Sequence, residues 1–327
     1  MQKEIKKIAV FTSGGDAPGM NAAIRAVVRA GLYNHLEVFG IMRGYEGLID
    51  NSFKTLNSKM VSNIIQQGGT ILKSARSKLF MTKEGRKIAY NNLKEKGIDA
   101  VVAIGGNGTF TGAKVFQEEY NIPFVGIPGT IDNDLCGTDY TIGYDTAINT
   151  AMQAIDKIRD TANAHNRLFF VEVMGRDAGF LALRSGISSG AEAVLLPEIS
   201  THLQNLHLYL ETGFKEKKSS GIIVIAEGEE EGGAYEIAKK VRTDFEDYDV
   251  RVTILGHVQR GGSPSAFDRV TASKLGVAAV EALLLGENDV MLGTKCGKVV
   301  SVPFSTVIRK DKKIDQKLYD LLTVLNY

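Results

Sequence analysis

The chain has little of what marks secreted, membrane or nucleic-acid-binding proteins. Its two cysteines, Cys136 and Cys296, lack both the density of a disulfide framework and the spacing of metal ligands. No apolar run approaches the length that spans a membrane, and the charged segment Met1–Lys7 has no secretory apolar region. Lys and Arg total 39 against 38 Asp and Glu, which argues against a broad basic surface for nucleic acid. We therefore expect a cytoplasmic globular protein without nucleic-acid or membrane partners.

The chain also lacks a Pro- or Ser-rich linker, although its 327 residues favour two domains over one. Short apolar runs alternate with longer helical patterns, which is typical of parallel sheets covered by helices. The predicted strands are Lys7–Thr12, Glu37–Met42, Ala100–Ile104, Pro123–Ile127, Leu168–Val173, Ala193–Leu196, Gly221–Ala226, Val250–Ile254 and Val299–Val302. The predicted helices are Ala17–Asn34, Lys83–Lys96, Thr109–Tyr120, Asp145–Thr161, Phe180–Ser189, Leu203–Lys217, Tyr235–Phe245, Ser265–Leu285 and Ile314–Leu325. Nine strands are many for one twisted sheet, so we expect an α/β fold of two Rossmann-like lobes, each a mostly parallel sheet flanked by helices.

The segment PGTIDND at 128–134 is the most informative part of the chain, because it directly follows the apolar run Phe124–Ile127. A buried strand that ends in Pro-Gly delivers a loop to the edge of a parallel sheet where ligands bind. If that loop is extended, Asp132 and Asp134 point to the same side. Two carboxylates and the Thr130 hydroxyl suit magnesium-assisted phosphoryl transfer. Asp and Asn are also ordinary turn residues, so this segment alone leaves both interpretations open.

Two glycine-rich loops also follow predicted strands and open predicted helices. They are Thr12–Gly19 and Gly105–Thr109. Glycine lets backbone N–H groups approach an anion, and a helix N-terminus adds unpaired donors and a favourable dipole. Neither loop ends in the Gly-Lys-Ser/Thr of a Walker A motif, and neither is a full G-x-G-x-x-G. One such loop could be a plain turn, whereas two beside an Asp-rich loop indicate a polyphosphate site.

Charged residues follow three strands in the second half of the chain. Arg176, Glu227 and His257 each stand just beyond the carboxyl end of a predicted strand. An arginine there can hold a phosphate, and a glutamate can accept hydrogen bonds from sugar hydroxyls. Each residue alone is more often a surface ion-pair partner, so it is their shared position that favours a site.

Four motifs together closely resemble the bacterial ATP-dependent 6-phosphofructokinases. They are TSGGDAPGMN at 12–21, PGTIDND at 128–134, VMGR at 173–176 and LGHVQRGGSP at 255–264, and the match runs from about Lys7 to Leu285. The resemblance implies transfer of the γ-phosphoryl group of ATP to the 1-hydroxyl of fructose 6-phosphate, with Mg2+, as the committing step of glycolysis. It also implies a cytosolic homotetramer with shared active and effector sites. The expected lobes are 1–143 plus 259–308 for ATP, and 144–258 plus 309–327 for fructose 6-phosphate.

The resemblance also assigns roles, position by position. Asp132 would accept the proton of the sugar hydroxyl, Thr130 would bind the transferring phosphoryl group, and Arg176 would stabilise its charge. Asp134 and Asn107 would lie near magnesium. ATP would be held by Gly15, Tyr45, Arg76, Ser77, Gly106, Asn107, Gly108 and Thr109. The sugar phosphate would be held by Thr130, Ile131, Asp132, Arg167, Met174, Gly175, Arg176, Glu227, Arg251, His257 and Arg260, with Arg167 and Arg251 reaching it from an adjacent subunit. The effector residues would be Arg25, Arg29, Arg159, Glu192 and Lys218, with ADP or phosphoenolpyruvate as the effector.

Two departures from the family pattern, and one difference from pyrophosphate-dependent relatives, bear on these assignments. Asn107 stands where an aspartate is usual, so we expect weaker metal dependence rather than loss of activity. Ser58 and Glu216 stand where an arginine and a lysine are usual, which predicts blunted or altered allostery. Gly108 and Gly129 replace an aspartate and a lysine of pyrophosphate-dependent relatives, which favours ATP as the donor.

The alternatives are a pyrophosphate-dependent enzyme, a weakly active regulatory binder suggested by Asn107 alone, and a dinucleotide oxidoreductase. The oxidoreductase lacks the full glycine fingerprint.

Overall fold

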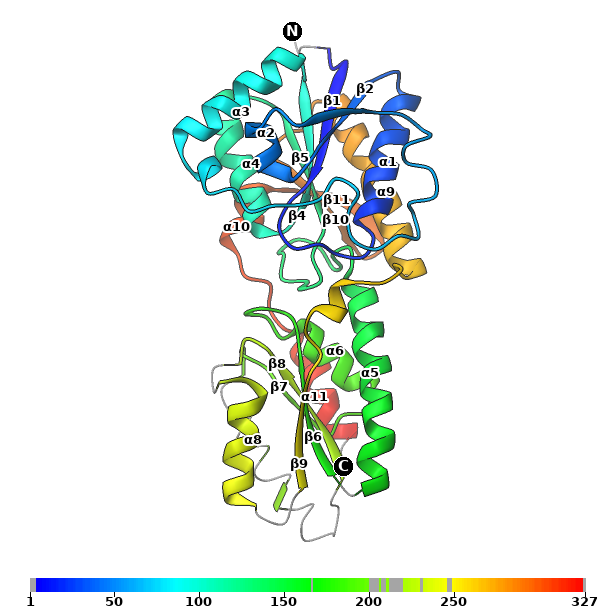
Figure 1. Cartoon of the computed structure of the whole chain (residues 1–327), viewed down its shortest axis with the longest axis vertical. Coiled ribbons are helices and arrows are strands. Elements are labelled where there is room, and N and C mark those ends of the chain that lie inside the picture. Colours follow the sequence, from blue (N-terminus) through cyan, green and yellow to red (C-terminus); the bar gives the residue numbers. More distant parts are fainter. Residues whose placement is uncertain are drawn as a thin grey trace. The chain divides into compact units, whose positions relative to one another are not determined.

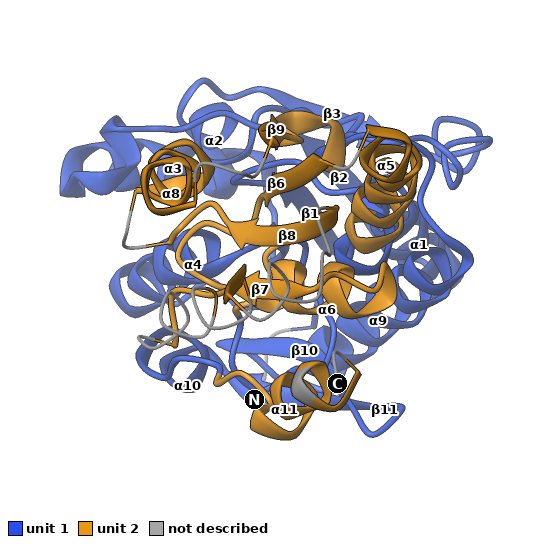
Figure 2. Cartoon of the chain, turned by 90° about the horizontal axis from the view of Figure 1, so that it is seen from below, with its two compact units in different colours: residues 1–130, 135–146, 260–312 blue, residues 131–134, 147–259, 313–327 orange. Residues whose placement is uncertain are grey.

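The computed structural model describes residues 4–165, 167–199, 206, 210–211, 220–229, 232–245 and 249–325. The chain forms two compact units (Figure 2). Unit 1 comprises Met1–Thr130, Leu135–Thr146 and Arg260–Lys312, and unit 2 comprises Ile131–Asp134, Ala147–Gln259 and Lys313–Tyr327. The segment Ile131–Asp134 packs with unit 2, whereas the boundaries expected from the sequence put it in the first lobe.

Unit 1 contains a seven-stranded sheet in the order β11-β10-β5-β4-β1-β2-β3. The parallel strands are β1 (Lys7–Thr12), β2 (Glu37–Ile41), β4 (Ala100–Gly105), β5 (Phe124–Pro128) and β10 (Val290–Lys295). The antiparallel edge strands are β3 (Phe53–Leu56) and β11 (Lys298–Pro303). This sheet is therefore mostly parallel, as predicted.

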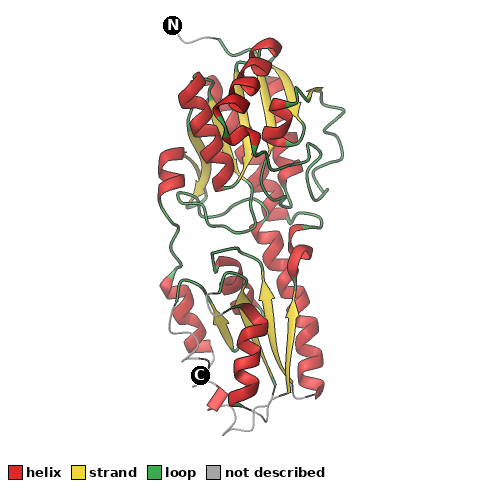
Figure 3. Ribbon diagram, turned by 60° about the vertical axis from the view of Figure 1, so that its left-hand side comes forward, coloured by secondary structure: helices red, strands yellow, loops and turns green. Residues whose placement is uncertain are grey.

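Helices cover both faces of the unit 1 sheet (Figures 1 and 3). On one face lie α1 (Met20–Tyr33) and α9 (Ala266–Leu284), which pack against each other. On the other lie α2 (Gly44–Ile49), α3 (Lys83–Lys96), α4 (Asn107–Tyr120) and α10 (Phe304–Arg309), with the single turn η1 (Leu79–Met81) beside α3. The alternation within the strands accounts for the two layers, because Ala9 and Phe11 of β1 belong to the cluster under α2, α3 and α4.

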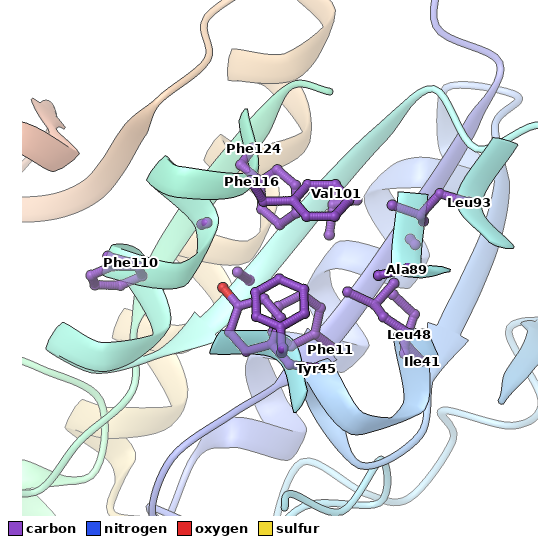
Figure 4. Packing of buried hydrophobic residues seen from close by; sticks show 14 of the residues in the cluster. Phe11, Ile41, Tyr45, Leu48, Ala89, Leu93, Val101, Phe110, Phe116 and Phe124 are labelled. Atoms are coloured by element: carbon purple, nitrogen blue, oxygen red, sulfur yellow. The ribbon is translucent and has the colours of Figure 1, made fainter. Parts of the chain in front are cut away.

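Aromatic rings dominate that cluster (Figure 4). Tyr45 is packed edge-on against Phe11, with ring centroids 4.8 Å apart, and stacks on Phe80 at 4.0 Å. Phe80 in turn stacks on Phe116 at 5.7 Å. Burial raises the pKa of the Tyr45 phenol, whose hydroxyl donates to the carbonyl of Thr109. The core of unit 1 therefore contacts the second glycine-rich loop directly.

Unit 2 contains a four-stranded parallel sheet in the order β7-β8-β6-β9. Its strands are β6 (Arg167–Val173), β7 (Ala193–Leu195), β8 (Gly221–Ala226) and β9 (Asp249–Ile254). Its helices are α5 (Tyr144–His165), which begins in unit 1, α6 (Phe180–Ser188), α8 (Gly233–Asp244) and α11 (Gln316–Leu325), and the turn η2 (Gly256–Arg260) follows β9. In the parts of the chain that the structure describes, no helix has the length and apolar character needed to cross a membrane.

The nine predicted strands are all present, but β3 and β10 were missed. β3 is a four-residue edge strand with a partly polar sequence, FKTL, and it carries no long apolar run. The helices α2 and α10 were also missed, because six residues are too few to show a helical period. Most of the predicted helix Leu203–Lys217 lies outside the described residues.

A buried carboxylate, Asp268, binds residues just before Ala147, one of the places where the chain passes from unit 1 to unit 2. It accepts hydrogen bonds from the Gly143 N–H at 2.9 Å and from the Thr146 N–H at 2.8 Å. The Thr146 hydroxyl also donates to it. Ser265, the N-cap of α9, accepts from the Asp268 N–H at 3.2 Å and donates to Asp145 at 2.6 Å. This network joins the start of α5 to the start of α9.

Asp268 predicts a specific dependence of stability on pH. Burial, opposed by the hydrogen bonds from Thr146 and Gly143 and reinforced by Asp145, raises the pKa of its carboxyl from 3.8 to about 6. The folded state therefore binds this proton more tightly than the unfolded state, so stability from this group is present below pH 4 and is lost as pH rises through 6. Lowering the pH from 7 to 5 should add about 1 kcal/mol to the free energy of unfolding, and Asp268→Asn should remove that gain. Denaturant titrations of the wild-type protein and of Asp268→Asn at each pH measure the free energy of unfolding. The same change with pH in both proteins would contradict the prediction.

Candidate active site

The first glycine-rich loop follows β1 and is fastened to the segment 67–74. The Thr12 hydroxyl donates to the carbonyl of Lys73 at 2.9 Å. Asn21, in the first turn of α1, accepts from the Ile71 N–H at 2.8 Å and donates to carbonyls of the same segment. Polar side chains buried beside a strand end thus anchor a long connection that would otherwise have few contacts.

The second glycine-rich loop packs against the first. Thr109 donates to the carbonyl of Ser13 at 3.3 Å, and the Gly129 N–H donates to the carbonyl of Gly105 at 3.0 Å. A Cβ atom on Gly105 would lie 2.3 Å from Thr109 Oγ1 and 2.5 Å from the Ser13 oxygen. The loops after β1 and β4 can meet only because Gly105 has no side chain.

The N-terminus of α4 is built to receive an anion. The helix is 14 residues long, its N-cap is Gly106, no side chain caps it, and its first turn has no acidic residue. The N–H groups and dipole of this end therefore favour negative charge. A Cβ atom on Gly108 would meet no described atom within 4 Å, so the space in front of this turn is open.

Three further residues expected at the nucleotide have different environments. Tyr45 is buried and contacts the loop from the core side, through Thr109. Arg76 is exposed, and Ser77 accepts from the Phe80 N–H at 3.2 Å. Tyr45 thus supports the loop by packing, while Arg76 has the exposure that a phosphate ligand needs.

The Asp-rich loop begins in unit 1 and continues in unit 2. Thr130 and Asp132 are buried, with 8% and 5% exposure, and the Thr141 hydroxyl donates to the Thr130 carbonyl at 2.6 Å. Asn133 has φ of 53°, in the left-handed region, so the segment is not extended. The sequence analysis placed Asp132 and Asp134 on the same side on the condition that this loop is extended, and that condition is not met.

Arg176, at the end of β6, is held in an unusual backbone conformation. Its φ is 55°, a left-handed value that costs a non-glycine residue about 1 kcal/mol. The Glu227 carboxylate accepts from the Arg176 N–H at 2.8 Å, and a Cβ atom on Gly228 would lie 2.0 Å from the Arg176 carbonyl oxygen. Glu227 therefore fixes the backbone that carries Arg176, a role that the sequence analysis did not identify.

Gln259 is a second residue that the sequence analysis missed. It is fully buried, accepts from the Met174 N–H at 3.3 Å and donates to the carbonyl of Gly256 at 3.0 Å. It links the loop after β6 to η2, which carries the exposed His257. The role of Gln259 depends on a contact with Met174, which is distant in the sequence, so no local sequence pattern predicts it.

The two strand-borne arginines expected at the sugar phosphate share one carboxylate. Arg167 Nε lies 2.8 Å from Asp249 Oδ2, and Arg251 Nη1 lies 2.7 Å from Asp249 Oδ1. Arg260, by contrast, lies in unit 1, where its Nη1 donates to the Asp16 carbonyl at 3.4 Å. A Cβ atom on Gly15 would lie 1.9 Å from that nitrogen, so Gly15 leaves room for the guanidinium.

The structure divides the expected residues between the units. Unit 1 holds Gly15, Arg25, Arg29, Tyr45, Arg76, Ser77, Gly106, Asn107, Gly108, Thr109, Thr130 and Arg260. Unit 2 holds Ile131, Asp132, Asp134, Arg159, Arg167, Met174, Gly175, Arg176, Glu192, Glu227, Arg251 and His257. The residues expected at the nucleotide thus all belong to unit 1, and most of those expected at the sugar belong to unit 2.

Among the expected effector residues, Arg159 and Glu192 bind each other. Arg159 Nη1 lies 3.0 Å from Glu192 Oε1, and Glu192 also accepts from the Ile222 N–H. Arg25 lies one turn from Arg29 on α1, and burial together with the charge of Arg29 lowers its pKa. Lys218 and Glu216 lie outside the described residues. Across the described ranges, no group of three or more His, Cys, Asp or Glu side chains is placed to hold a metal ion.

Comparison with known proteins identifies the family of this chain. A family model described as phosphofructokinase matches residues 7–283. A Bacteroides thetaiotaomicron protein named ATP-dependent 6-phosphofructokinase 2 is 57% identical over 322 residues, which cover 98% of this chain and 99% of the relative. A Cytophaga hutchinsonii protein named ATP-dependent 6-phosphofructokinase is 58% identical over 322 residues, 98% of each chain. The chain therefore belongs to the phosphofructokinase family.

Solved structures share the fold. Phosphofructokinase from Saccharomyces cerevisiae matches with a TM-score of 0.86 and 36% identity, over 98% of this chain and 46% of the yeast chain. This chain thus spans about half the length of that yeast protein. A pyrophosphate-dependent phosphofructokinase from Marinobacter aquaeolei matches with a TM-score of 0.84 over 98% of this chain and 91% of its own, at 21% identity. That likeness concerns the fold alone.

The contact at Gly105 predicts a difference between two alanine substitutions. Gly105→Ala should lower the free energy of unfolding by roughly 1–3 kcal/mol, because the new Cβ overlaps a backbone oxygen. Gly108→Ala, three residues on, enters open space and should leave stability unchanged or slightly raised. Chemical denaturation of both variants measures this, and an equal loss in both would contradict the packing of the two loops.

Proposed function

We propose that this chain is an ATP-dependent 6-phosphofructokinase, which converts ATP and D-fructose 6-phosphate to ADP and fructose 1,6-bisphosphate. The observation that carries the proposal is identity of 57% and 58% to relatives of that name over 98% of this chain. The arrangement of the strand ends supports it, because an anion-binding helix end, an acidic loop and an arginine follow parallel strands.

The residues of this chain have separate roles in the proposed reaction. The N–H groups at the start of α4 bind the phosphates of ATP, and the loops after β1 and β5 support that turn. The Asp132 carboxylate accepts the proton of the sugar 1-hydroxyl as its oxygen bonds to the γ-phosphorus. The bond from that phosphorus to the bridging oxygen breaks, and ADP leaves. Thr130 binds the transferring group and Arg176 stabilises its charge.

Magnesium belongs to this proposal as well. The carboxylate of Asp134 and the amide oxygen of Asn107 are hard oxygen donors of the kind that Mg2+ prefers. When bound with ATP, the ion neutralises charge on the phosphates. Because Asn107 is neutral and exposed, it adds less attraction than an aspartate would, so magnesium should bind more weakly than is usual for the family.

We also propose a cytosolic homotetramer that acts in glycolysis and is regulated weakly at the effector site. Ser58 is an exposed neutral residue where an arginine was expected, and Arg159 is paired with Glu192. Because fewer cationic side chains are available, anionic effectors such as ADP and phosphoenolpyruvate should bind more weakly.

Two alternatives are less well supported. A pyrophosphate-dependent enzyme would need a lysine at position 129, but a Cβ atom there would lie 3.0 Å from Ile104 and 3.1 Å from Met20. A weakly active regulatory binder is opposed by the presence of Thr130, Asp132 and Arg176 together.

The phosphoryl donor tests the proposed function directly. Purified protein given fructose 6-phosphate and magnesium should form fructose 1,6-bisphosphate with ATP, and at background rate with pyrophosphate. A coupled assay that detects the bisphosphate serves both donors equally. Faster turnover with pyrophosphate would assign the alternative donor, and no turnover with either would leave only the binding role.

Asp132 is the residue on which the chemistry depends most. Asp132→Asn keeps the shape of the side chain but removes the proton acceptor, so kcat should fall by about 10²–10⁴-fold. Binding of ATP and of fructose 6-phosphate, measured by calorimetry, should persist. Undiminished kcat in this variant would show that another group accepts the proton.

A further inference from the structure

Asp249 occupies a position that stability does not explain. It lies at the start of β9, an edge strand of the unit 2 sheet, and its side chain is 42% exposed. Aspartate is disfavoured in strands, and a surface ion pair contributes little to folding. Asp249 nevertheless binds two arginines at once, Arg167 and Arg251, which suggests a purpose connected with them.

The strand register accounts for this grouping. Arg167 is the first residue of β6 and is paired with Asp249 across the parallel ladder. Arg251 follows Asp249 by two residues on β9, so all three side chains stand on one face of the sheet. Arg167 Nε lies 2.8 Å from Asp249 Oδ2, while Arg251 Nη1 and Nη2 lie 2.7 Å from Oδ1 and 3.1 Å from Oδ2.

The carboxylate leaves most of the arginine donors available. Each guanidinium has five N–H groups. Asp249 uses one on Arg167 and two on Arg251, and Arg251 Nη1 also donates to the Val250 carbonyl at 3.5 Å. Without the carboxylate, two like charges on neighbouring strands would repel each other and move apart. With it, the pair forms a single cationic group with a net charge of about +1, whose remaining donors bind no other residue that the structure describes and can serve a second anion.

We propose that Asp249 is a positioning residue, which holds Arg167 and Arg251 together as one binding group for the 6-phosphate of the sugar. This inference rests on the proposed function and on the expectation, drawn from the family resemblance, that Arg167 and Arg251 contact that phosphate from an adjacent subunit. The physical gain is preorganisation: two long side chains are already ordered before the ligand arrives. This gain should exceed the repulsion between the Asp249 carboxylate and the phosphate, because solvent screens that repulsion and the guanidinium groups would lie between the two anions.

Asp249→Asn tests the proposal, because asparagine keeps the size of the side chain and loses its charge. The KM for fructose 6-phosphate should rise about tenfold, the change expected for one lost charge-assisted interaction. The KM for ATP, kcat and the thermal midpoint should stay close to those of the wild-type protein. Asp249→Glu retains a carboxylate and should recover part of the loss.

Asp50→Asn is the matched control. Asp50 binds Arg43 in unit 1 and, like Asp249, its side chain is 42% exposed, but no sugar-binding role is proposed for it. Its substitution should leave the KM for fructose 6-phosphate unchanged. In an Arg167→Ala background, the effect of Asp249→Asn should shrink, because one of the two groups to be held is already absent.

Calorimetric titration with fructose 6-phosphate separates this inference from the proposed function, since it needs no turnover. Weaker binding to Asp249→Asn, with binding to Asp50→Asn unchanged, supports the positioning role. Equal or tighter binding to Asp249→Asn overturns it, and tighter binding would mean that the carboxylate repels the phosphate. A wild-type protein that binds the sugar phosphate but transfers no phosphoryl group overturns the proposed function alone.

Discussion

The fold of unit 1 depends on one constraint: the loops after three neighbouring parallel strands must pack closely against one another. β4 pairs with β1 on one side and β5 on the other, with Thr12 opposite Ile104 and Gly105 opposite Pro128. This register brings the loops after all three strands together, and the absence of a side chain at Gly105 lets the loops after β1 and β4 touch. The N-terminus of α4 follows the loop after β4. Because no side chain caps it, its first N–H groups are left for a ligand.

Unit 2 also fixes the loops at its strand ends, but it does so in a different way. Here the loops at the strand ends are held by side chains that reach backbone groups: Glu227 holds Arg176, and Gln259 connects the loop after β6 to η2. The left-handed backbone at Arg176 is tolerated because this carboxylate and the close approach of Gly228 stabilise it. Carboxylates thus orient arginines twice in this unit, through the backbone at Arg176 and through the side chains at Asp249.

The family and the fold class were predictable from the sequence, because apolar runs mark buried strands and four motifs are long enough to identify relatives. Elements without such runs, such as β3 and α2, were not. The roles of Glu227 and Asp249 were also out of reach. Glu227 lies 51 residues from Arg176 and Asp249 lies 82 residues from Arg167, so that only the pairing of strands brings them together. At Asn133, a single left-handed φ removed the basis for aligning two carboxylates by alternation. The assignments of individual site residues stay predictions.

Unit 1 is assembled from three separate stretches of chain, and the last of them contributes α9, β10 and β11. During synthesis, β5 therefore leaves the ribosome well before β10, the strand that pairs with its outer edge. Until the stretch ending at Lys312 arrives, the nascent sheet has an uncovered edge, and the side of α1 that packs against α9 has no partner. Folding of the N-terminal half is thus completed late, and the interval before completion is when the growing polypeptide is most exposed to aggregation.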